Sequence, residues 1–136
     1  MTYLPPETPE AAAAREALYR DWMTEHDISR ALGVSLTQVT QMRRAKELLS
    51  VWVHERHEYR FPPFQLHDGR PNPKMPELLN LLADVSGSGW GWIEWFVSCR
   101  TLLQGAQPRD LIEKGRFDEV LAAANEEATR HPDANW

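Results

Sequence analysis

A short proline-containing segment, YRFPPFQL at residues 59–66, divides this sequence. Two adjacent prolines, Pro62 and Pro63, exclude a helix interior here, because each lacks a backbone N–H and Pro63 holds Pro62 in an extended conformation. The aromatic residues around them favour burial. We therefore predict a short edge strand that continues into an extended, buried connector packed against both flanking halves. An ordinary core strand is the alternative.

Charge is unevenly distributed along the 136 residues, whose formal net charge is −5. From Arg30 to Arg60 there are six Arg or Lys against three Glu, whereas from Asp68 onward seven basic residues stand against eleven acidic ones. A locally positive region on an acidic protein predicts one polyanionic partner and a different second partner. We place a domain boundary between the two regions, giving domains 1–66 and 67–136.

Two short helices joined by a glycine turn are predicted in the first domain. Thr24 and Asp27 have the spacing of a capping box, and Gly33 ends the helix that they begin. Ser35 caps the next helix, whose Leu36, Val39 and Met42 recur at the spacing of an inward face. An earlier helix is predicted from Pro9 to about Trp22, with Ala14 among its inward residues. The pair around Gly33 has the spacing of a helix-turn-helix, with a positive φ at the glycine.

The outward face of the second of these helices carries side chains of the types that recognise DNA. Gln pairs with adenine, Arg with guanine, and Thr or Ser with phosphate oxygens or the thymine methyl group. No acidic residue lies between Leu36 and Ala45, whereas most solvated helix faces carry some. A polar solvent-facing surface is the alternative. The predicted DNA contacts, including one from the hairpin that follows, are Ser35, Thr37, Gln38, Thr40, Gln41, Arg43, Arg44 and Arg56.

A β-hairpin is predicted directly after this helix, from residues 48–53 and 59–61. Arg56 lies in the polar turn between the two strands, where the tip of a wing touches the phosphate backbone. His54 and His57 in the same turn are spaced like a pair of metal ligands. Because no cysteine is nearby, we predict no metal site there.

The second domain is predicted to be helical and rich in tryptophan. A buried helix with Pro76 in its first turn ends at the SGSG segment of residues 86–89. An aromatic helix follows from Trp90 to about Arg100, and Trp90 is equally consistent with a core position and with an exposed interface anchor. Further helices are predicted from Pro108 and from about Phe117.

Cysteine use and the absence of catalytic motifs restrict the class of protein. The single Cys99 excludes an intramolecular disulfide, is typical of a reducing compartment and is predicted to be a buried thiol. The first residues do not resemble a secretion signal, and no apolar run approaches the ~20 residues that span a bilayer. We therefore expect a cytoplasmic protein without membrane contact. The sequence shows no paired nucleophile and base, no metal-ligand spacing and no phosphate loop, so we expect neither an enzyme nor a cofactor.

Three motifs occur in order along the chain: the connector at 59–66, the segment from Trp92 to Phe96, and the run LQGAQPRDLIEKG at 103–115 followed by Val120. Together they resemble the "fP.fQF" element, the tryptophan-bearing helix and the "L.G.tP.dll..G....V" motif of the Xre/MbcA/ParS family of bacterial antitoxins. The resemblance covers residues 25–128. Gln107 replaces the Thr that caps a helix in the family, and Leu66 replaces the second Phe of the connector.

The resemblance implies a DNA-binding N-terminal region and a C-terminal domain that binds a toxin, usually a RES-domain toxin that consumes NAD or transfers ADP-ribose from it. We expect a mainly α antitoxin that neutralises this toxin and represses its own operon. A homodimer is expected, because helix-turn-helix proteins read paired half-sites. The alternative is a stand-alone transcription regulator whose C-terminal half only dimerises.

The polar tail that follows the last helix is the segment expected to enter the toxin, because it ends in a large aromatic residue that can anchor a contact. The expected toxin contacts are Trp90, Arg130, His131 and Trp136. A frayed terminus, or a Trp136 folded back on its own domain, is the alternative.

Overall fold

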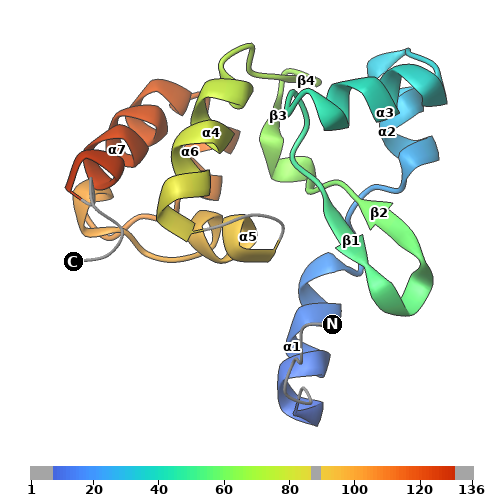
Figure 1. The fold of residues 1–136 in the computed structure, drawn as a ribbon, viewed down its shortest axis with the longest axis horizontal. Coiled ribbons are helices and arrows are strands. Elements are labelled where there is room, and N and C mark those ends of the chain that lie inside the picture. Colours follow the sequence, from blue (N-terminus) through green and yellow to red (C-terminus); the bar gives the residue numbers. More distant parts are fainter. Residues whose placement is uncertain (1–7, 87–89, 131–136) are drawn as a thin grey trace.

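The computed structural model describes residues 8–86 and 90–130, and the chain is mainly α, as predicted (Figure 1). The α-helices are α1 (Pro9–Tyr19), α2 (Glu25–Leu32), α3 (Leu36–Arg44), α4 (Met75–Ser86), α5 (Trp90–Phe96), α6 (Pro108–Glu113) and α7 (Phe117–Arg130). The strands β1 (Val51–Val53) and β2 (Glu58–Arg60) form one antiparallel pair, and β3 (Leu66–His67) and β4 (Arg70–Pro71) form another. None of the helices in these two ranges is long and apolar enough to cross a bilayer.

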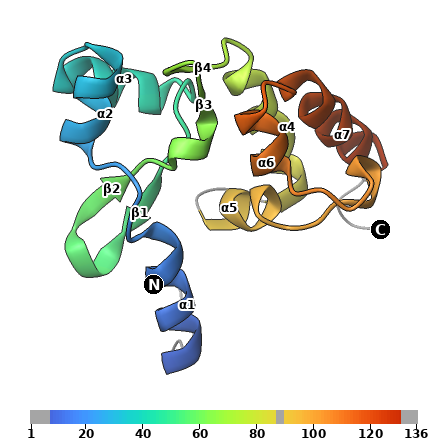
Figure 2. The ribbon, with the colours of Figure 1, turned by 180° about the vertical axis from the view of Figure 1, so that it is seen from behind.

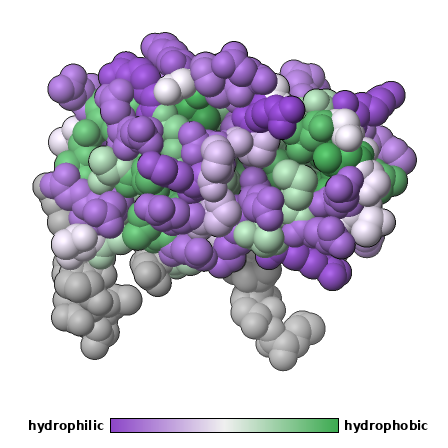
Figure 3. Space-filling view, turned by 90° about the horizontal axis from the view of Figure 1, so that it is seen from above, coloured by the Kyte–Doolittle hydropathy of each residue, from purple (hydrophilic) through white to green (hydrophobic). Residues whose placement is uncertain are grey.

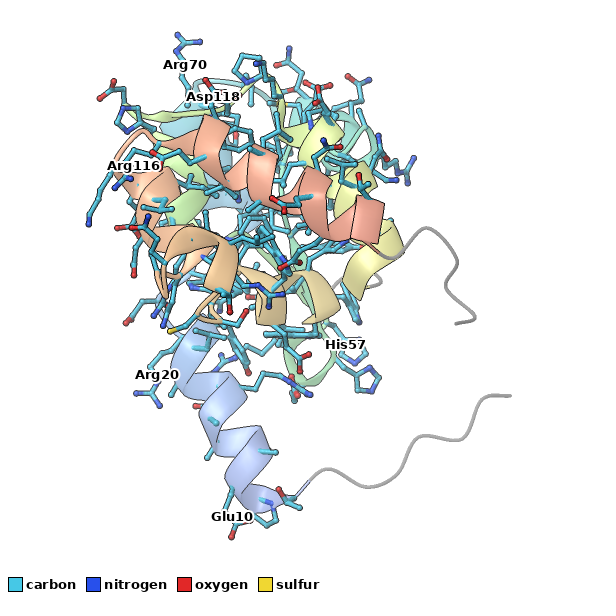
Figure 4. The ribbon with its side chains drawn as sticks, turned by 90° about the vertical axis from the view of Figure 1, so that its left-hand side faces the viewer. Glu10, Arg20, His57, Arg70, Arg116 and Asp118 are labelled. Atoms are coloured by element: carbon cyan, nitrogen blue, oxygen red, sulfur yellow. The ribbon has the colours of Figure 1, made fainter. Side chains whose placement is uncertain are left out.

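The molecule has two lobes, with α4–α7 on one side and α2–α3 on the other (Figure 1). The β1–β2 hairpin extends from the α2–α3 lobe, and α1 projects beyond it (Figures 1 and 2). Glu10 lies near the far end of α1, well away from the body (Figure 4). Seen from above, the surface is mainly hydrophilic, and hydrophobic residues show through on both lobes (Figure 3).

Helix α1 begins where the sequence predicts and ends earlier. The Thr8 hydroxyl accepts the Ala11 N–H at 3.1 Å, which caps the first turn. The helix ends at Tyr19, and a turn at residues 20–22 leads to Met23, which exchanges backbone hydrogen bonds of 3.0 and 2.8 Å with Phe61. Ala14, predicted to face inward, is exposed, since Tyr19 is the residue of α1 that is buried in the core.

Thr24 and Ser35 cap α2 and α3, as predicted, and both caps are reciprocal, although the sequence predicts a capping box only at Thr24. The Asp27 N–H donates to the Thr24 hydroxyl at 3.2 Å, and the Thr24 N–H donates to the Asp27 carboxylate at 3.1 Å. This backbone hydrogen bond from Thr24 lowers the pKa of the Asp27 carboxyl. Ser35 and Gln38 make the equivalent exchange at the start of α3. Gly33 closes α2 with a φ of 69°, the left-handed conformation that the tight turn requires.

The connector at 59–66 is buried at Phe61, Pro62, Phe64 and Gln65, whereas Pro63 is exposed, and the connector is not fully extended. Pro62 has the extended ψ of 128° that the following proline imposes, and Pro63–Gln65 then form a 3-10 turn. Gln65 is 1% exposed and pairs with the backbone of Leu49: its Oε1 accepts the Leu49 N–H, and its Nε2 donates to the Leu49 carbonyl, both at 2.8 Å. A second bond from Nε2 reaches the Pro62 carbonyl at 3.0 Å. A side chain therefore supplies the pairing that a neighbouring strand would give.

The hydrophobic residues form two clusters. A small cluster of Ile28, Val39, Leu48 and Phe61 holds α2 and α3 together. A larger cluster contains inward residues of α4–α7 and also residues from the first half of the chain. These first-half residues are Tyr19, Trp22, Leu49, Val51, Val53 and Phe64. The larger core therefore crosses the sequence position, after residue 66, at which the domain boundary was placed.

A buried polar network holds the end of α5 against α7. The Glu127 carboxylate is 8% exposed and accepts the Trp95 indole N–H at 2.6 Å. It also accepts two hydrogen bonds from the Arg100 guanidinium, at 3.0 and 2.6 Å. Burial of this carboxylate is tolerated because charged and neutral donors compensate for its lost hydration.

The prediction of a buried thiol at Cys99 is wrong, since this residue is exposed. The predicted helix extended to about Arg100, which would have placed Cys99 on a packed face. Helix α5 instead ends at Phe96, and residues 97–100 lead into a 3-10 turn at Thr101–Leu103. Past the helix end, helical spacing no longer decides which side chains are buried.

Replacing Gln65 by Met should lower the free energy of unfolding by roughly 2–4 kcal/mol, because each buried backbone group that loses its partner costs about 1–3 kcal/mol. Gln41→Met, at an exposed position of α3, is the control and should change stability by less than about 0.5 kcal/mol. Urea unfolding followed by circular dichroism measures both. Equal stability of the two variants would contradict a structural role for the Gln65 amide.

Candidate nucleic-acid interface

The outward face of α3 is solvent-exposed along its length. Val39 is fully buried against the small core, so the opposite side of the helix faces away from the protein. Thr37, Gln41 and Arg44 are exposed on that side, and no acidic side chain interrupts them. The predicted DNA-contacting residues of α3 are thus presented together, apart from Thr40 and Arg43, which are half-buried.

Ser35 and Gln38 are partly committed to the cap of α3. The Gln38 Oε1 accepts the Ser35 N–H at 2.9 Å, and the Ser35 hydroxyl accepts the Gln38 N–H at 3.1 Å. With its carbonyl oxygen in use, Gln38 retains its amide N–H groups as donors. Bidentate pairing with adenine needs both a donor and an acceptor, so Gln38 would have to share its carbonyl oxygen between the adenine and the cap.

The two arginines at the end of α3 have different surroundings, which the sequence did not reveal. The Arg43 guanidinium lies over the Tyr59 ring, with its carbon 3.9 Å from the ring centroid. This cation–π contact joins the end of α3 to strand β2. Arg44 is exposed on the outward face. Arg44 is therefore the more accessible guanidinium, while Arg43 also has a structural role.

Arg56 lies in the 3-10 turn His54–Arg56 at the tip of the β1–β2 hairpin and is exposed. A side-chain hydrogen bond with Tyr19 raises the pKa of the Arg56 guanidinium. The same contact draws Arg56 toward α1. The rings of His54 and His57 are 5.6 Å apart in this turn, and His57 projects from the body (Figure 4). Within residues 8–86 and 90–130, no three His, Cys, Asp or Glu residues are grouped to hold a metal ion.

A row of side chains, apolar or aromatic at Leu36, Tyr59 and Trp52, runs from α3 onto the hairpin. Leu36, predicted to face inward, is 39% exposed, because the first position of α3 lies beyond the edge of the small core. Trp52 on β1 is 43% exposed and packs edge-on against Tyr59, its partner in the strand register, at 4.9 Å between ring centroids. We refer to Leu36, Thr40, Arg43, Tyr59 and Trp52 as the α3–hairpin strip.

The Trp90 ring joins the two lobes instead of standing free. It stacks on Trp22 at 6.1 Å and 20° and lies 6.1 Å from the Tyr19 ring. Its indole N–H donates to the Trp52 carbonyl at 3.3 Å, and the Arg15 guanidinium lies 5.1 Å from its centroid. These contacts give Trp90 a structural role, and its expected contact with a toxin stays a prediction.

The other expected toxin contacts lie at the end of the described chain. Arg130 is the last residue of α7. His131 and Trp136 lie outside the described residues.

Comparison with known proteins identifies the fold. No family model matches the sequence, and no curated protein matches it. The structure is similar to the NMR structure of Rv2175c, with a TM-score of 0.67 over 92% of this chain and 99% of that chain. Sequence identity is 21%, so the similarity establishes a shared fold for nearly the whole of both chains.

Trp90→Ala should lower the free energy of unfolding by about 2–4 kcal/mol, because the half-buried ring packs on two aromatic side chains and bonds to a backbone carbonyl. Trp52→Ala is the matched control, since it removes the same ring from a more exposed position and leaves the Trp52 carbonyl in place. Its cost should be smaller, about 1–2 kcal/mol, because the Trp52 ring packs on Tyr59. Chemical denaturation measures both. Equal losses would show that Trp90 does not hold the lobes together.

Proposed function

We propose that this protein binds duplex DNA through the outward face of α3. The observation that carries the proposal is that face itself, which is exposed, free of acidic side chains and made of Thr, Gln and Arg. Thr and Arg contact phosphate oxygens, and Gln and Arg contact base edges in the major groove. Helix α2 and the Gly33 turn hold α3 by its opposite side, an arrangement in which a second helix can enter the groove.

The charge distribution supports the same proposal. The segment from Arg30 to Arg60 is positive, whereas the chain from Asp68 onward is negative. A phosphate backbone is therefore attracted to the α2–α3 lobe and repelled by the lobe of α4–α7. This asymmetry orients the protein on DNA with the second lobe directed away.

The biological role that we propose is repression of the protein's own operon as a homodimer. Helix-turn-helix proteins read two half-sites one helical turn of DNA apart, about 34 Å, and a single α3 covers only one of them. A two-fold dimer would present two copies of α3 to a palindromic operator.

Replacing Arg43 and Arg44 together by Ala should weaken binding to the promoter DNA of the protein's own gene. The dependence of log K on log salt should become shallower by about one unit for each phosphate that the variant no longer neutralises. Arg44→Ala alone should account for most of this change, because Arg43 is held over Tyr59. Fluorescence anisotropy at several salt concentrations measures affinity and slope.

Lys114→Ala removes an exposed cation from the other lobe and is the control, which should leave both quantities unchanged. If the Arg43/Arg44 double variant binds with wild-type affinity and slope, α3 is not the helix that reads DNA.

We also propose that the protein acts as an antitoxin that binds and neutralises a RES-type toxin. This proposal rests on the resemblance of the connector and of residues 103–115 to the Xre/MbcA/ParS family. Two residues of these motifs occupy positions at which substitution is restricted. The Gln65 side chain pairs with the Leu49 backbone, and a Cβ at Gly115 would lie 2.8 Å from the His67 Nε2. Such positions support a shared scaffold, and a stand-alone regulator that uses this scaffold only to dimerise is the alternative.

Among the expected toxin contacts, the tail is favoured over Trp90, whose ring is already engaged within the protein. Helix α7, after which the tail follows in the sequence, ends at Arg130 at the edge of the lobe opposite α2–α3 (Figure 1). A toxin bound there and DNA bound at α3 would occupy different sides of the molecule. One protein could therefore hold both partners at once.

Deletion of residues 130–136 should leave the fold and DNA binding unchanged and abolish protection against the co-expressed toxin. The reason is that the core residues of the described chain extend no further than Ala124, so the deletion removes none of them. Growth after toxin induction, circular dichroism and DNA anisotropy measure the three properties. Full protection by the shortened protein would place the toxin contact on the helices, and the absence of any toxin gene beside this gene would favour the stand-alone regulator.

A further inference from the structure

We propose that the α3–hairpin strip is a contact surface for DNA, whose apolar side chains pack against deoxyribose rings and thymine methyl groups of a strand lying across α3 and the β1–β2 hairpin. The inference rests on the proposed DNA binding and adds a second kind of contact to it. The outward face of α3 supplies polar and charged groups, whereas the strip adds the apolar or aromatic side chains of Leu36, Tyr59 and Trp52. Leu36 is assigned to the thymine methyl and Trp52 to the sugars.

The strip is one continuous surface. Leu36, Thr40 and Arg43 are spaced by four and then three residues, which places them on one side of α3. The Arg43 guanidinium lies over the Tyr59 ring at 3.9 Å and carries the row from the helix to the hairpin. Tyr59 and Trp52 are opposite each other in the β1–β2 register, with ring centroids 4.9 Å apart.

Exposure singles out the two ends of this strip. In the part of the chain that the structure describes, Leu36 and Trp52 are the large hydrophobic residues that are exposed, at 39% and 43%. Both belong to the lobe that carries α3, and both lie on the same row of side chains. An exposed indole and an exposed leucine at the two ends of one row indicate a binding surface.

Charge favours nucleic acid as the occupant. Arg44 is exposed on α3 next to Arg43 of the strip, and Glu58, the acid next to Tyr59, is paired with Arg60. A nucleic-acid strand offers apolar sugars and base edges between its phosphates, so it matches apolar side chains with arginines among and beside them. A second copy of this chain fits less well, because a two-fold contact through the strip would bring Arg43 and Arg44 close to their own copies.

The position of Leu36 specifies the base feature that it contacts. The N-terminal residues of a recognition helix reach the base edges in the major groove, and Leu36 is the first residue of α3. The thymine methyl is the apolar group that the major groove presents, and a leucine has no donor or acceptor with which to read any other edge. Trp52, on the hairpin, lies on the side of the strip where the sugar-phosphate backbone would pass.

The test uses the full-length protein and a duplex that the wild-type protein selects from a random-sequence library. Failure to select any duplex would refute the proposed DNA binding itself. Leu36→Ala and Trp52→Ala should each weaken binding about five- to tenfold, in the range of single base or stacking contacts. Their salt slopes should equal that of the wild type, because neither residue neutralises a phosphate, whereas Arg44→Ala should lower the slope by about one unit.

A second measurement isolates the methyl contact. Deoxyuridine in place of thymidine removes only the 5-methyl group, so the wild-type protein should bind the substituted duplex about five- to tenfold more weakly. Leu36→Ala should show no further loss on this duplex, and Trp52→Ala should show the full loss. The wild-type comparison needs no variant, so it remains decisive if either variant fails to fold.

Wild-type affinity of both variants, or equal binding of the thymidine and deoxyuridine duplexes by the wild type, would overturn the proposal. If the variants bind DNA normally and sediment as smaller species, the strip is an interface between two copies of the chain. A loss of affinity together with a shallower salt slope in Trp52→Ala would show that the effect is electrostatic and would also overturn the assignment.

Discussion

The two hydrogen bonds between the Gln65 side chain and the Leu49 backbone are the constraint on which the rest of the structure depends. Leu49 follows α3 and leads into β1, whereas Gln65 follows the hairpin, so the pair closes the base of the segment that contains β1 and β2. Leu49 and Phe64 also belong to the larger core. This one buried contact therefore fixes the base of the hairpin. It also links the end of α3 to the core of the second lobe.

A second junction lies around Trp90, where α5 reaches back to the first half of the chain. The ring stacks on Trp22, and its indole N–H bonds to the carbonyl of Trp52, the residue whose side chain ends the α3–hairpin strip. The backbone of the hairpin is thus held from the second lobe, while its outer face stays exposed. A partner that moved α5 would shift the hairpin as well, which gives the two proposed binding functions a physical route of coupling.

Polar capping has a direct effect on the candidate interface. Gln38 and Ser35 belong to the outward face of α3, yet they use part of their hydrogen-bonding capacity on the first turn of the helix. Arg43 likewise divides its role between the hairpin and the surface. The groups most available to a ligand are Thr37, Gln41, Arg44 and the apolar end at Leu36. The candidate interface therefore has fewer available polar side chains, and a larger apolar share, than the amino-acid composition of α3 indicates.

Local sequence determined the features that depend on neighbouring residues: the caps at Thr24 and Ser35, the positive φ at Gly33, the extended Pro62 and the mainly α class. Each follows from the conformational preference or hydrogen bonding of residues within one turn. Long-range packing decided the rest. Cys99 is exposed because α5 ends before it. Trp90 is half-buried because it packs on aromatic residues about 70 positions earlier in the sequence. The α3–hairpin strip is continuous because a cation–π contact joins α3 to β2. Helical periodicity indicates which side of a helix is apolar, but the side that is covered depends on which segments the folded chain brings against it.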